Sequence, residues 1–122
     1  MEDRILIVDD EELICRLLAQ RLKGEGYSCV TANNGREALT HFYKDTFSLI
    51  ISDIKMPELD GIETTKEIYQ QLGENRPYII AMTANVSQDT ERKCLTSKMN
   101  DYISKPINIA QLHDMIKKWL NC

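Results

Sequence analysis

The sequence lacks any apolar run near the roughly 18 residues that a membrane-spanning helix requires, and it lacks a basic block or stripe. Acidic residues outnumber basic ones, 19 against 15, which gives a net charge of −4. We therefore expect no direct binding to nucleic acid and no membrane contact by this chain. The apolar stretch after the N-terminus is too short and too soon acidic for a signal peptide, so we expect a cytoplasmic location.

The four cysteines form no C-x-x-C pair, and no histidine lies at metal-ligand spacing from any of them. We interpret them as free thiols, buried or at the surface, in a reducing compartment.

The sequence also lacks a linker or a low-complexity segment. A chain of 122 residues is long enough for one domain with one core, and its hydrophobic share of 43% is ordinary for such a domain. We therefore expect a single domain over residues 1–122.

Short apolar runs alternate five times with segments of helical spacing. The runs are rich in Ile, Val and Leu without regular polar interruptions, which is typical of strands covered on both faces. This alternation predicts an α/β fold with a five-stranded, doubly wound parallel sheet and helices on both sides. We expect strands at 5–8, 27–32, 49–51, 78–82 and 102–104, and helices at 11–23, from the cap Asn34, at 60–72, 87–97 and 109–120.

Carboxylates follow two of these apolar runs. The first run leads into Asp9 and Asp10, and the third leads through Ser52 into Asp53. Ligands of open parallel sheets bind outside the carboxyl ends of the strands. If the two strands are neighbours, the three carboxylates share one edge of the sheet.

Such a cluster is costly without a counter-charge. Two unit charges about 5 Å apart repel by roughly 3 kcal/mol at an effective dielectric constant near 20. Three such pairs give roughly 10 kcal/mol before water and protonation reduce it, which is comparable to the stability of a domain. A small set of oxygen ligands with room for water favours Mg²⁺ over Ca²⁺ or Zn²⁺.

Simpler roles exist for each residue alone. Asp9 or Asp10 could cap the first helix, and Asp53 could be a turn residue ahead of Pro57. Each of these alternatives explains one residue, whereas the metal site explains why all three follow apolar strands.

Two further strand ends carry a hydroxyl and an ammonium group, at Thr83 and Lys105. A hydrogen-bond donor and a counter-charge are what a phosphoryl group at this edge would need. Taken singly, Thr83 could be an ordinary strand-end residue and Lys105 a solvated lysine, so their common location is the argument.

Four motifs occur along the chain: IVDDE at 7–11, SDIKMPELDG at 52–61, AMTAN at 81–85 and DYISKPI at 101–107. With these motifs, in this order, the sequence resembles the receiver domains of two-component response regulators. The motif sequences are most similar to those of receivers in hybrid sensor histidine kinases. The resemblance implies a flavodoxin-like (βα)5 fold with strand order 2-1-3-4-5.

The resemblance also implies a phosphoacceptor site. Asp53 would accept a phosphoryl group from a phosphohistidine on a histidine kinase or a histidine phosphotransfer domain. Mg²⁺ would be bound by Asp10, Asp53 and the main-chain carbonyl of Lys55, with Asp9 acting mainly through a water. Lys105 would pair with the phosphoryl oxygens.

A switch would couple this site to a binding surface. Thr83 would move its hydroxyl onto the phosphoryl group, and Tyr102 would follow as the coupled aromatic residue, although a half-buried strand aromatic is the simpler interpretation of Tyr102. The Lys105–Pro106 bond would be cis, which proline makes feasible. Ile14 and Pro106 are the predicted partner-docking residues, because the apolar stripe of the first helix is wider than one packed face requires; all five of its apolar residues could equally be core.

The implied protein is a regulatory phosphoacceptor, a monomer or weak dimer with limited self-catalysed phosphotransfer and autodephosphorylation, rather than an enzyme. It is either a stand-alone relay or a receiver of a larger hybrid kinase. One alternative is a Mg²⁺ phosphohydrolase of the haloacid dehalogenase type, but Glu11 stands where that family has a second Asp after Asp9. Another is a degenerate module that binds partners without phosphorylation and gains no stability from Mg²⁺.

Overall fold

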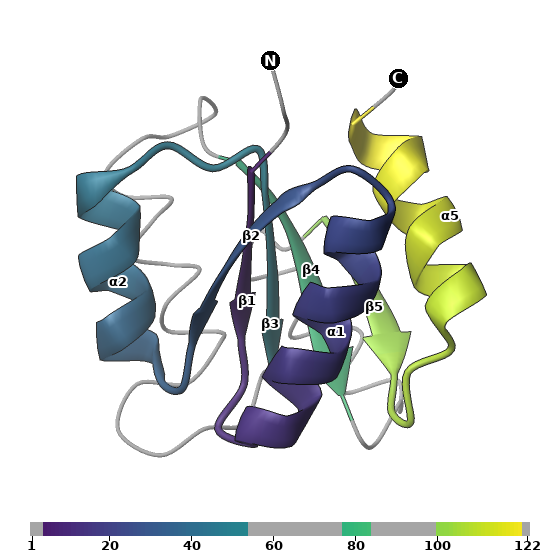
Figure 1. Ribbon diagram of the computed structural model, residues 1–122, viewed down its shortest axis with the longest axis horizontal. Helices are drawn as coiled ribbons and strands as arrows, with labels where there is room; N and C mark the ends of the chain where they lie inside the picture. The colour runs from purple at the N-terminus through teal and green to yellow at the C-terminus, as the bar shows by residue number, and fades with distance from the viewer. Residues whose placement is uncertain (1–3, 54–76, 84–99, 121–122) are drawn as a thin grey trace.

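The computed structural model describes residues 4–53, 77–83 and 100–120, which comprise five strands and three helices (Figure 1). The expected helices at 60–72 and 87–97 lie outside the described residues. The elements are β1 (Arg4–Val8), α1 (Glu12–Gly24), β2 (Ser28–Ala32), α2 (Gly35–Lys44), β3 (Leu49–Asp53), β4 (Tyr78–Thr83), β5 (Asp101–Ser104) and α5 (Ile109–Leu120).

The five strands form one parallel sheet in the order β2-β1-β3-β4-β5, which confirms the predicted fold and strand order. β1 and β3 are direct neighbours, with Val8 opposite Ser52. Since all strands run the same way, their carboxyl ends meet at one edge, the lower edge in Figure 1. Asp9, which follows β1, and Asp53, the last residue of β3, therefore come together as expected.

Alternate residues of each strand enter two separate core layers. On the face seen in Figure 1, residues such as Ile7 and Ile51 pack beneath α1 and α5. On the other face, residues such as Val8 and Ile50 pack with α2. Every residue of β3 is buried, in agreement with a strand covered on both sides.

The helix boundaries follow the local sequence signals. The Asn34 side chain accepts a hydrogen bond from the Glu37 N–H at 2.8 Å and so caps α2, as predicted. α1 ends at Gly24, and the chain turns at Gly26, whose φ of 97° lies in the left-handed region that glycine adopts without a Cβ clash.

α5 is held against the edge of the sheet by polar and aromatic contacts. The Trp119 Nε1–H donates to Asp101 Oδ2 on β5 at 3.0 Å, and its ring lies 5.3 Å from the ring of Tyr78 on β4. Leu112 and Ile116, on the side of α5 that packs against the sheet, are fully buried. Among the described residues, we find no helix whose length and apolar character would let it cross a membrane.

Substitution of Gly26 tests this turn. We expect Gly26→Ala to lower the free energy of unfolding by about 1 kcal/mol, because an L-residue is strained at positive φ. An added Cβ would meet no atom within 4 Å at either Gly26 or Gly24. Gly24→Ala, in the last turn of α1, is therefore the matched control and is expected to leave stability unchanged or raise it. Equal effects in urea unfolding would contradict the backbone explanation.

Candidate functional site

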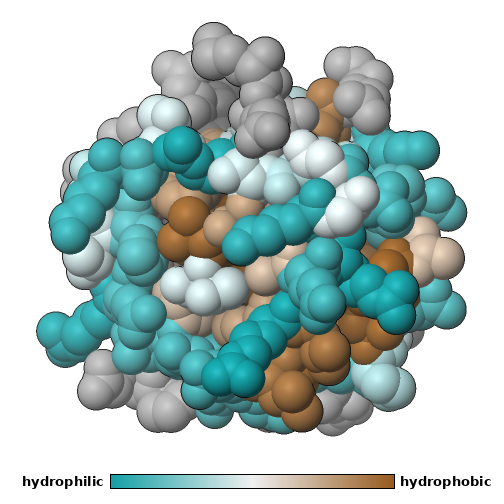
Figure 2. All heavy atoms as spheres, viewed as in Figure 1, coloured by the Kyte–Doolittle hydropathy of each residue, from teal (hydrophilic) through white to brown (hydrophobic). Residues whose placement is uncertain are grey.

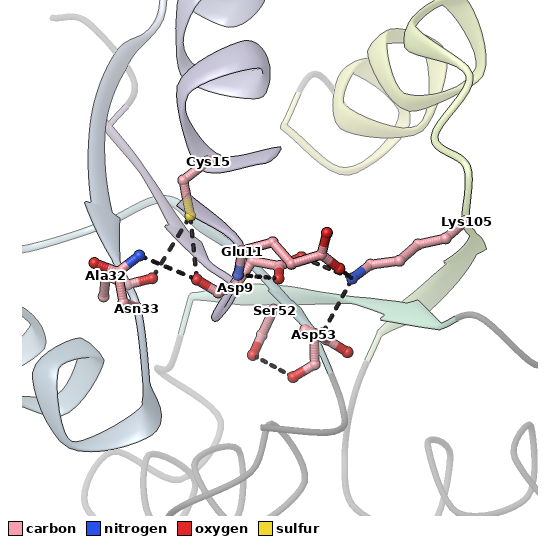
Figure 3. Close-up of polar contacts among 8 residues, drawn as sticks. All are labelled: Asp9, Glu11, Cys15, Ala32, Asn33, Ser52, Asp53 and Lys105. Carbon is pink, nitrogen blue, oxygen red and sulfur yellow. Dashed lines mark hydrogen bonds and ion pairs between the residues drawn. The ribbon is translucent and has the colours of Figure 1, made fainter. Parts of the chain in front are cut away.

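The site is built where β1, β3 and β5 end at the carboxyl edge of the sheet. Asp9 follows β1, Asp53 is the last residue of β3, and Lys105 follows β5. Asp9 and Asp53 continue the alternation of Ile7 and Ile51, so both carboxylates lie on the face covered by α1 and α5. Figure 3 shows the Lys105 side chain reaching across this edge toward both of them.

The Lys105 ammonium group bridges the two buried carboxylates. Its Nζ lies 2.8 Å from Asp9 Oδ2 and 3.0 Å from Asp53 Oδ2. The Asp9 side chain is fully buried, and only 14% of the Lys105 side chain is exposed. Burial alone would lower the pKa of Lys105, but the hydrogen bonds and charges of Asp9 and Asp53 outweigh it and raise that pKa. Lys105 is therefore the permanent counter-charge of the site.

Two further carboxylates, those of Glu11 and Asp10, lie at the solvent-exposed side of the site. Glu11 Oε1 lies 3.9 Å from Lys105 Nζ on an exposed side chain. Asp10 is also exposed, yet partial desolvation and then the neighbouring Asp9 and Asp53 carboxylates raise its pKa. Among the described residues, four carboxylates thus lie at this edge with one ammonium group, which contacts Asp9 and Asp53 most closely. The negative charge left over suits a cation.

The arrangement of oxygen atoms fits a magnesium ion. One carboxylate oxygen from each of Asp9, Asp10 and Asp53 lies within 4.8 Å of the others. The Oδ2 atom of Asp9 is buried and forms an ion pair with the Lys105 ammonium group. Among the described residues, no donor makes a hydrogen bond of good geometry to this oxygen. Oxygen ligands with room for water are the preference of Mg²⁺. Asp9, Asp10 and Asp53 could therefore hold this metal, directly or through water.

The alternative that Asp9 or Asp10 caps the first helix is wrong, because Glu11 occupies the N-cap position of α1. Asp9 instead makes a local turn with one of its two carboxylate oxygens. Asp9 Oδ1 accepts a hydrogen bond at 2.9 Å from the N–H of Glu11, the residue before the first turn of α1. Its Oδ2 faces Lys105. The local turn thus orients the carboxylate, and the second oxygen remains directed into the site.

The predicted switch residues lie on the opposite face of the sheet from the carboxylates. Thr83 is buried at the end of β4, and its backbone oxygen accepts a hydrogen bond from the Lys105 N–H at 2.8 Å. Tyr102 of β5 is half-buried against the core layer of α2 and lies opposite Ala81 in the β4–β5 register. Thr83 and Ala81 alternate with Met82, so Thr83 and Tyr102 share this face.

The other predicted site residues have mixed outcomes. The Lys105–Pro106 peptide bond is cis, as expected. Lys55 lies outside the described residues. Pro106 is exposed, whereas Ile14 is half-buried and packs against the core.

The apolar stripe of α1 is partly exposed, as predicted, and the alternative that all five residues are core is wrong. Leu18 and Leu22 are buried, but Leu13 and Leu17 are 66% and 51% exposed. These two residues, rather than Ile14, contribute the most exposed surface, because they project from the side of the helix that faces away from the sheet. Figure 2 shows apolar surface over α1 on this face of the molecule.

Two residues near the site did not emerge from the sequence. Cys15 Sγ lies 3.4 Å from the backbone oxygen of Asp9, and Asn33 Nδ2 lies 3.3 Å from the same oxygen (Figure 3). Burial, and to a lesser degree the charge of Asp9, raises the pKa of Cys15 to about 11, so the thiol keeps its proton. Neither residue belongs to a motif. Cys15 lies near the start of α1, and Asn33 directly follows β2, so position along the chain is their only sequence signal.

The sequence model of the response regulator receiver domain matches residues 5–117. The chain belongs to this family. Among curated relatives, it is 40% identical over 116 residues to the sensor histidine kinase RcsC of Escherichia coli, a match that covers 95% of this chain and 12% of RcsC. It is 37% identical over 131 residues to hybrid signal transduction histidine kinase B of Dictyostelium discoideum, covering 98% of this chain and 7% of the relative. The chain therefore spans a small part of these kinases.

A similar solved structure is a co-crystal of the Saccharomyces cerevisiae histidine phosphotransfer protein Ypd1 with the receiver domain of its downstream response regulator Ssk1. The similarity has a TM-score of 0.91 and 33% sequence identity, and it covers 97% of this chain and 88% of the other. The haloacid dehalogenase alternative is not supported, since both the sequence model and the fold are those of receiver domains.

The unfavourable environment of the Asp10 carboxylate, partly desolvated and beside Asp9 and Asp53, can be tested by substitution. A pKa raised in the folded state means that Asp10 stabilises the fold when protonated and that this contribution is lost as the pH rises through the folded-state pKa. We therefore expect Asp10→Asn to be more stable than the wild type at neutral pH without divalent cations. The difference should shrink in acid, below the ordinary carboxyl range.

Urea unfolding of both proteins at the two pH values measures this difference. Asp114→Asn, an exposed carboxylate on α5, is the control and should change stability little at either pH. An Asp10→Asn protein that is less stable than the wild type at neutral pH would show that crowding is not the dominant effect.

Proposed function

We propose that this receiver accepts a phosphoryl group from a phosphohistidine partner onto Asp53 in a Mg²⁺-dependent reaction, and that phosphorylation switches a binding surface through Thr83 and Tyr102. The observation that supports it best is the meeting of Asp9, Asp53 and Lys105 at one edge, with Asp10 within reach. Family membership supports a role in two-component signalling.

The chemistry assigned to Asp53 is a direct transfer. A carboxylate oxygen of Asp53 forms a bond to phosphorus while the bond between phosphorus and the partner's imidazole nitrogen breaks, and the imidazole leaves. Phosphoryl transfer depends mainly on positioning and charge neutralisation. Mg²⁺, held by Asp10, Asp53 and the Lys55 carbonyl, with Asp9 acting through water, would supply part of that neutralisation.

Lys105 is placed to supply the rest. Its ammonium group already lies 3.0 Å from an Asp53 oxygen, so a phosphoryl group on Asp53 would bring its oxygens within reach of the same ammonium. The second contact, to Asp9 at 2.8 Å, keeps the side chain at this edge when the first contact is exchanged. The contact to Asp53 is a charge-assisted hydrogen bond, and bonds of this kind are among the stronger ones in proteins.

The proposed switch uses the face of the sheet opposite the carboxylates. The Thr83 hydroxyl would move toward the phosphoryl group, and Tyr102 would turn inward into the space that this movement leaves. Tyr102 lies opposite Ala81 in the β4–β5 register, on the same face of the sheet as Thr83. The negative charge of the phosphoryl group would favour the conformation in which Thr83 and Tyr102 have moved over the unphosphorylated one.

For the partner we propose a histidine kinase or histidine phosphotransfer domain that docks on α1 beside the site. The Ssk1 receiver forms a complex with the histidine phosphotransfer protein Ypd1. In this chain, Leu13 and Leu17 expose apolar surface on α1, next to half-buried Ile14, and Pro106 is exposed beside Lys105. Contacts at these residues would bring the phosphohistidine to Asp53.

The remaining assignments complete the proposal. We propose that residues 1–122 form one regulatory receiver unit of a hybrid kinase or relay, with limited autodephosphorylation rather than enzymatic turnover. We further propose a cytoplasmic location and a monomer or weak dimer.

Labelling tests the central assignment. We expect the chain, incubated with Mg²⁺ and a phosphorylated histidine phosphotransfer protein or acetyl phosphate, to acquire an acid-labile, hydroxylamine-sensitive phosphoryl group. Asp53→Asn should lose the label because its amide cannot form the acyl phosphate. Lys105→Met should slow labelling strongly.

Metal binding supplies an independent readout. Mg²⁺ at ten times its dissociation constant should raise the free energy of unfolding by about 1.4 kcal/mol. Undiminished label in Asp53→Asn would refute the acceptor assignment. An unchanged unfolding free energy with Mg²⁺ would favour a degenerate module.

The docking surface can be tested on exposed residues that leave the core intact. We expect Leu13→Gln and Leu17→Gln each to weaken binding of a histidine phosphotransfer protein about fivefold or more, because an apolar anchor at an interface contributes upwards of roughly 1 kcal/mol. Gln has helix propensity similar to Leu, so folding should be preserved. Tyr43→Gln, an equally exposed site on α2, is the control. If Tyr43→Gln weakens binding and the leucine variants do not, docking is on another surface.

A further inference from the structure

The backbone carbonyl of Asp9 is held by two side chains that take no part in the carboxylate–lysine cluster. Cys15 Sγ on α1 lies 3.4 Å from this oxygen, and Asn33 Nδ2, just after β2, lies 3.3 Å from it. The Asp9 N–H donates to the backbone oxygen of Ala32 at 3.0 Å. The chain leaving β1 is therefore held from α1 and from the end of β2 (Figure 3).

This carbonyl belongs to the peptide group that joins Asp9 to Asp10. Because a peptide group is planar, the direction of its oxygen sets the direction in which the chain continues to the Asp10 Cα. The register of β1 with both neighbours ends at Val8, so pairing within the sheet does not orient this peptide. The two side-chain donors contact the chain just beyond Val8, the last residue of β1 that is paired with both neighbouring strands.

The two donors differ in how firmly they are placed. Cys15 is 2% exposed and belongs to the core layer of α1 and α5, so its packing fixes the position of the sulfur atom. Its thiol also lies 3.7 Å from the Ala32 oxygen. Asn33 is exposed and approaches from the loop. A thiol is a weak donor, so we expect each contact to have a modest effect and the pair a larger one.

We propose that Cys15 and Asn33 are positioning residues for the magnesium site: they orient the Asp9–Asp10 peptide so that both carboxylates face Asp53. The inference rests on the proposed function, because it assigns these residues to the same metal site. Neither side chain touches the metal or the phosphoryl group. Their contribution is to hold the ligands in place before the ion arrives, which lowers the cost of binding it.

The test is Mg²⁺ binding to the unphosphorylated full chain, measured by isothermal titration calorimetry. We expect Cys15→Ala and Asn33→Ala each to weaken Mg²⁺ binding about twofold to fivefold, the lower part of the range that loss of one net hydrogen bond gives. The double variant should lose more than the product of the single effects, because each donor partly compensates for loss of the other.

Three comparisons separate positioning from general stability. Cys15→Ser keeps a donor and should bind Mg²⁺ within about twofold of the wild type, a smaller loss than a missing hydrogen bond gives. Cys29→Ala removes a half-buried thiol that packs against the same core layer from β2 and should leave Mg²⁺ affinity unchanged. Urea unfolding of each variant records the accompanying loss of stability.

Wild-type Mg²⁺ affinity in both Cys15→Ala and Asn33→Ala would overturn the proposal. So would an equal loss of affinity in Cys29→Ala, because affinity would then follow stability. If Cys15→Ala does not fold, Asn33→Ala decides by the same criterion, since its side chain lies outside the core. A wild-type chain without Mg²⁺ binding would overturn the proposed function as well, whereas wild-type binding that these variants leave unchanged would overturn only the positioning role.

Discussion

An ammonium group held between two buried carboxylates is the interaction on which the rest of this site depends. Lys105 joins the ends of β1, β3 and β5, which are far apart in the sequence, through contacts of 2.8 Å to Asp9 and 3.0 Å to Asp53. Without this charge, two carboxylates would be buried beside each other at a cost of several kcal/mol. The lysine makes the acidic edge tolerable, and the negative charge that remains at this edge is the basis of the proposed Mg²⁺ site.

The parallel sheet divides the proposed functions between its two faces. Side chains alternate along a strand, so Asp9 and Asp53 lie on the face of α1 and α5, while Thr83 and Tyr102 lie on the face of α2. The backbone of β4 connects the two sides, because the Thr83 carbonyl accepts the Lys105 N–H. In the proposed switch, a charge placed on Asp53 would act on the opposite face through these contacts of neighbouring strand ends.

α1 serves the site through three different sets of residues. Its buried side, which includes Leu18 and Leu22, packs on the sheet and fixes the helix. Cys15 reaches from that side to the Asp9 carbonyl. Leu13 and Leu17 leave apolar surface exposed on the outer side, where a partner would approach. The proposed metal site and the proposed docking surface thus both depend on α1, so a partner bound to the helix surface would lie close to Asp53.

The sequence by itself determined the features that depend on local pattern: the strands from short apolar runs, the Asn34 cap, and the placement of Asp9, Asp53, Thr83 and Lys105 at strand ends. These follow from neighbours in the chain and from the common polarity of parallel strands. Only the tertiary structure decided that Asp9 is buried while adjacent Asp10 is exposed, that Leu13 and Leu17 are more exposed than Ile14, and that Cys15 and Asn33 meet at one carbonyl. Those outcomes depend on how helices pack against strands distant in the sequence, and residue spacing along the chain carries no record of that packing.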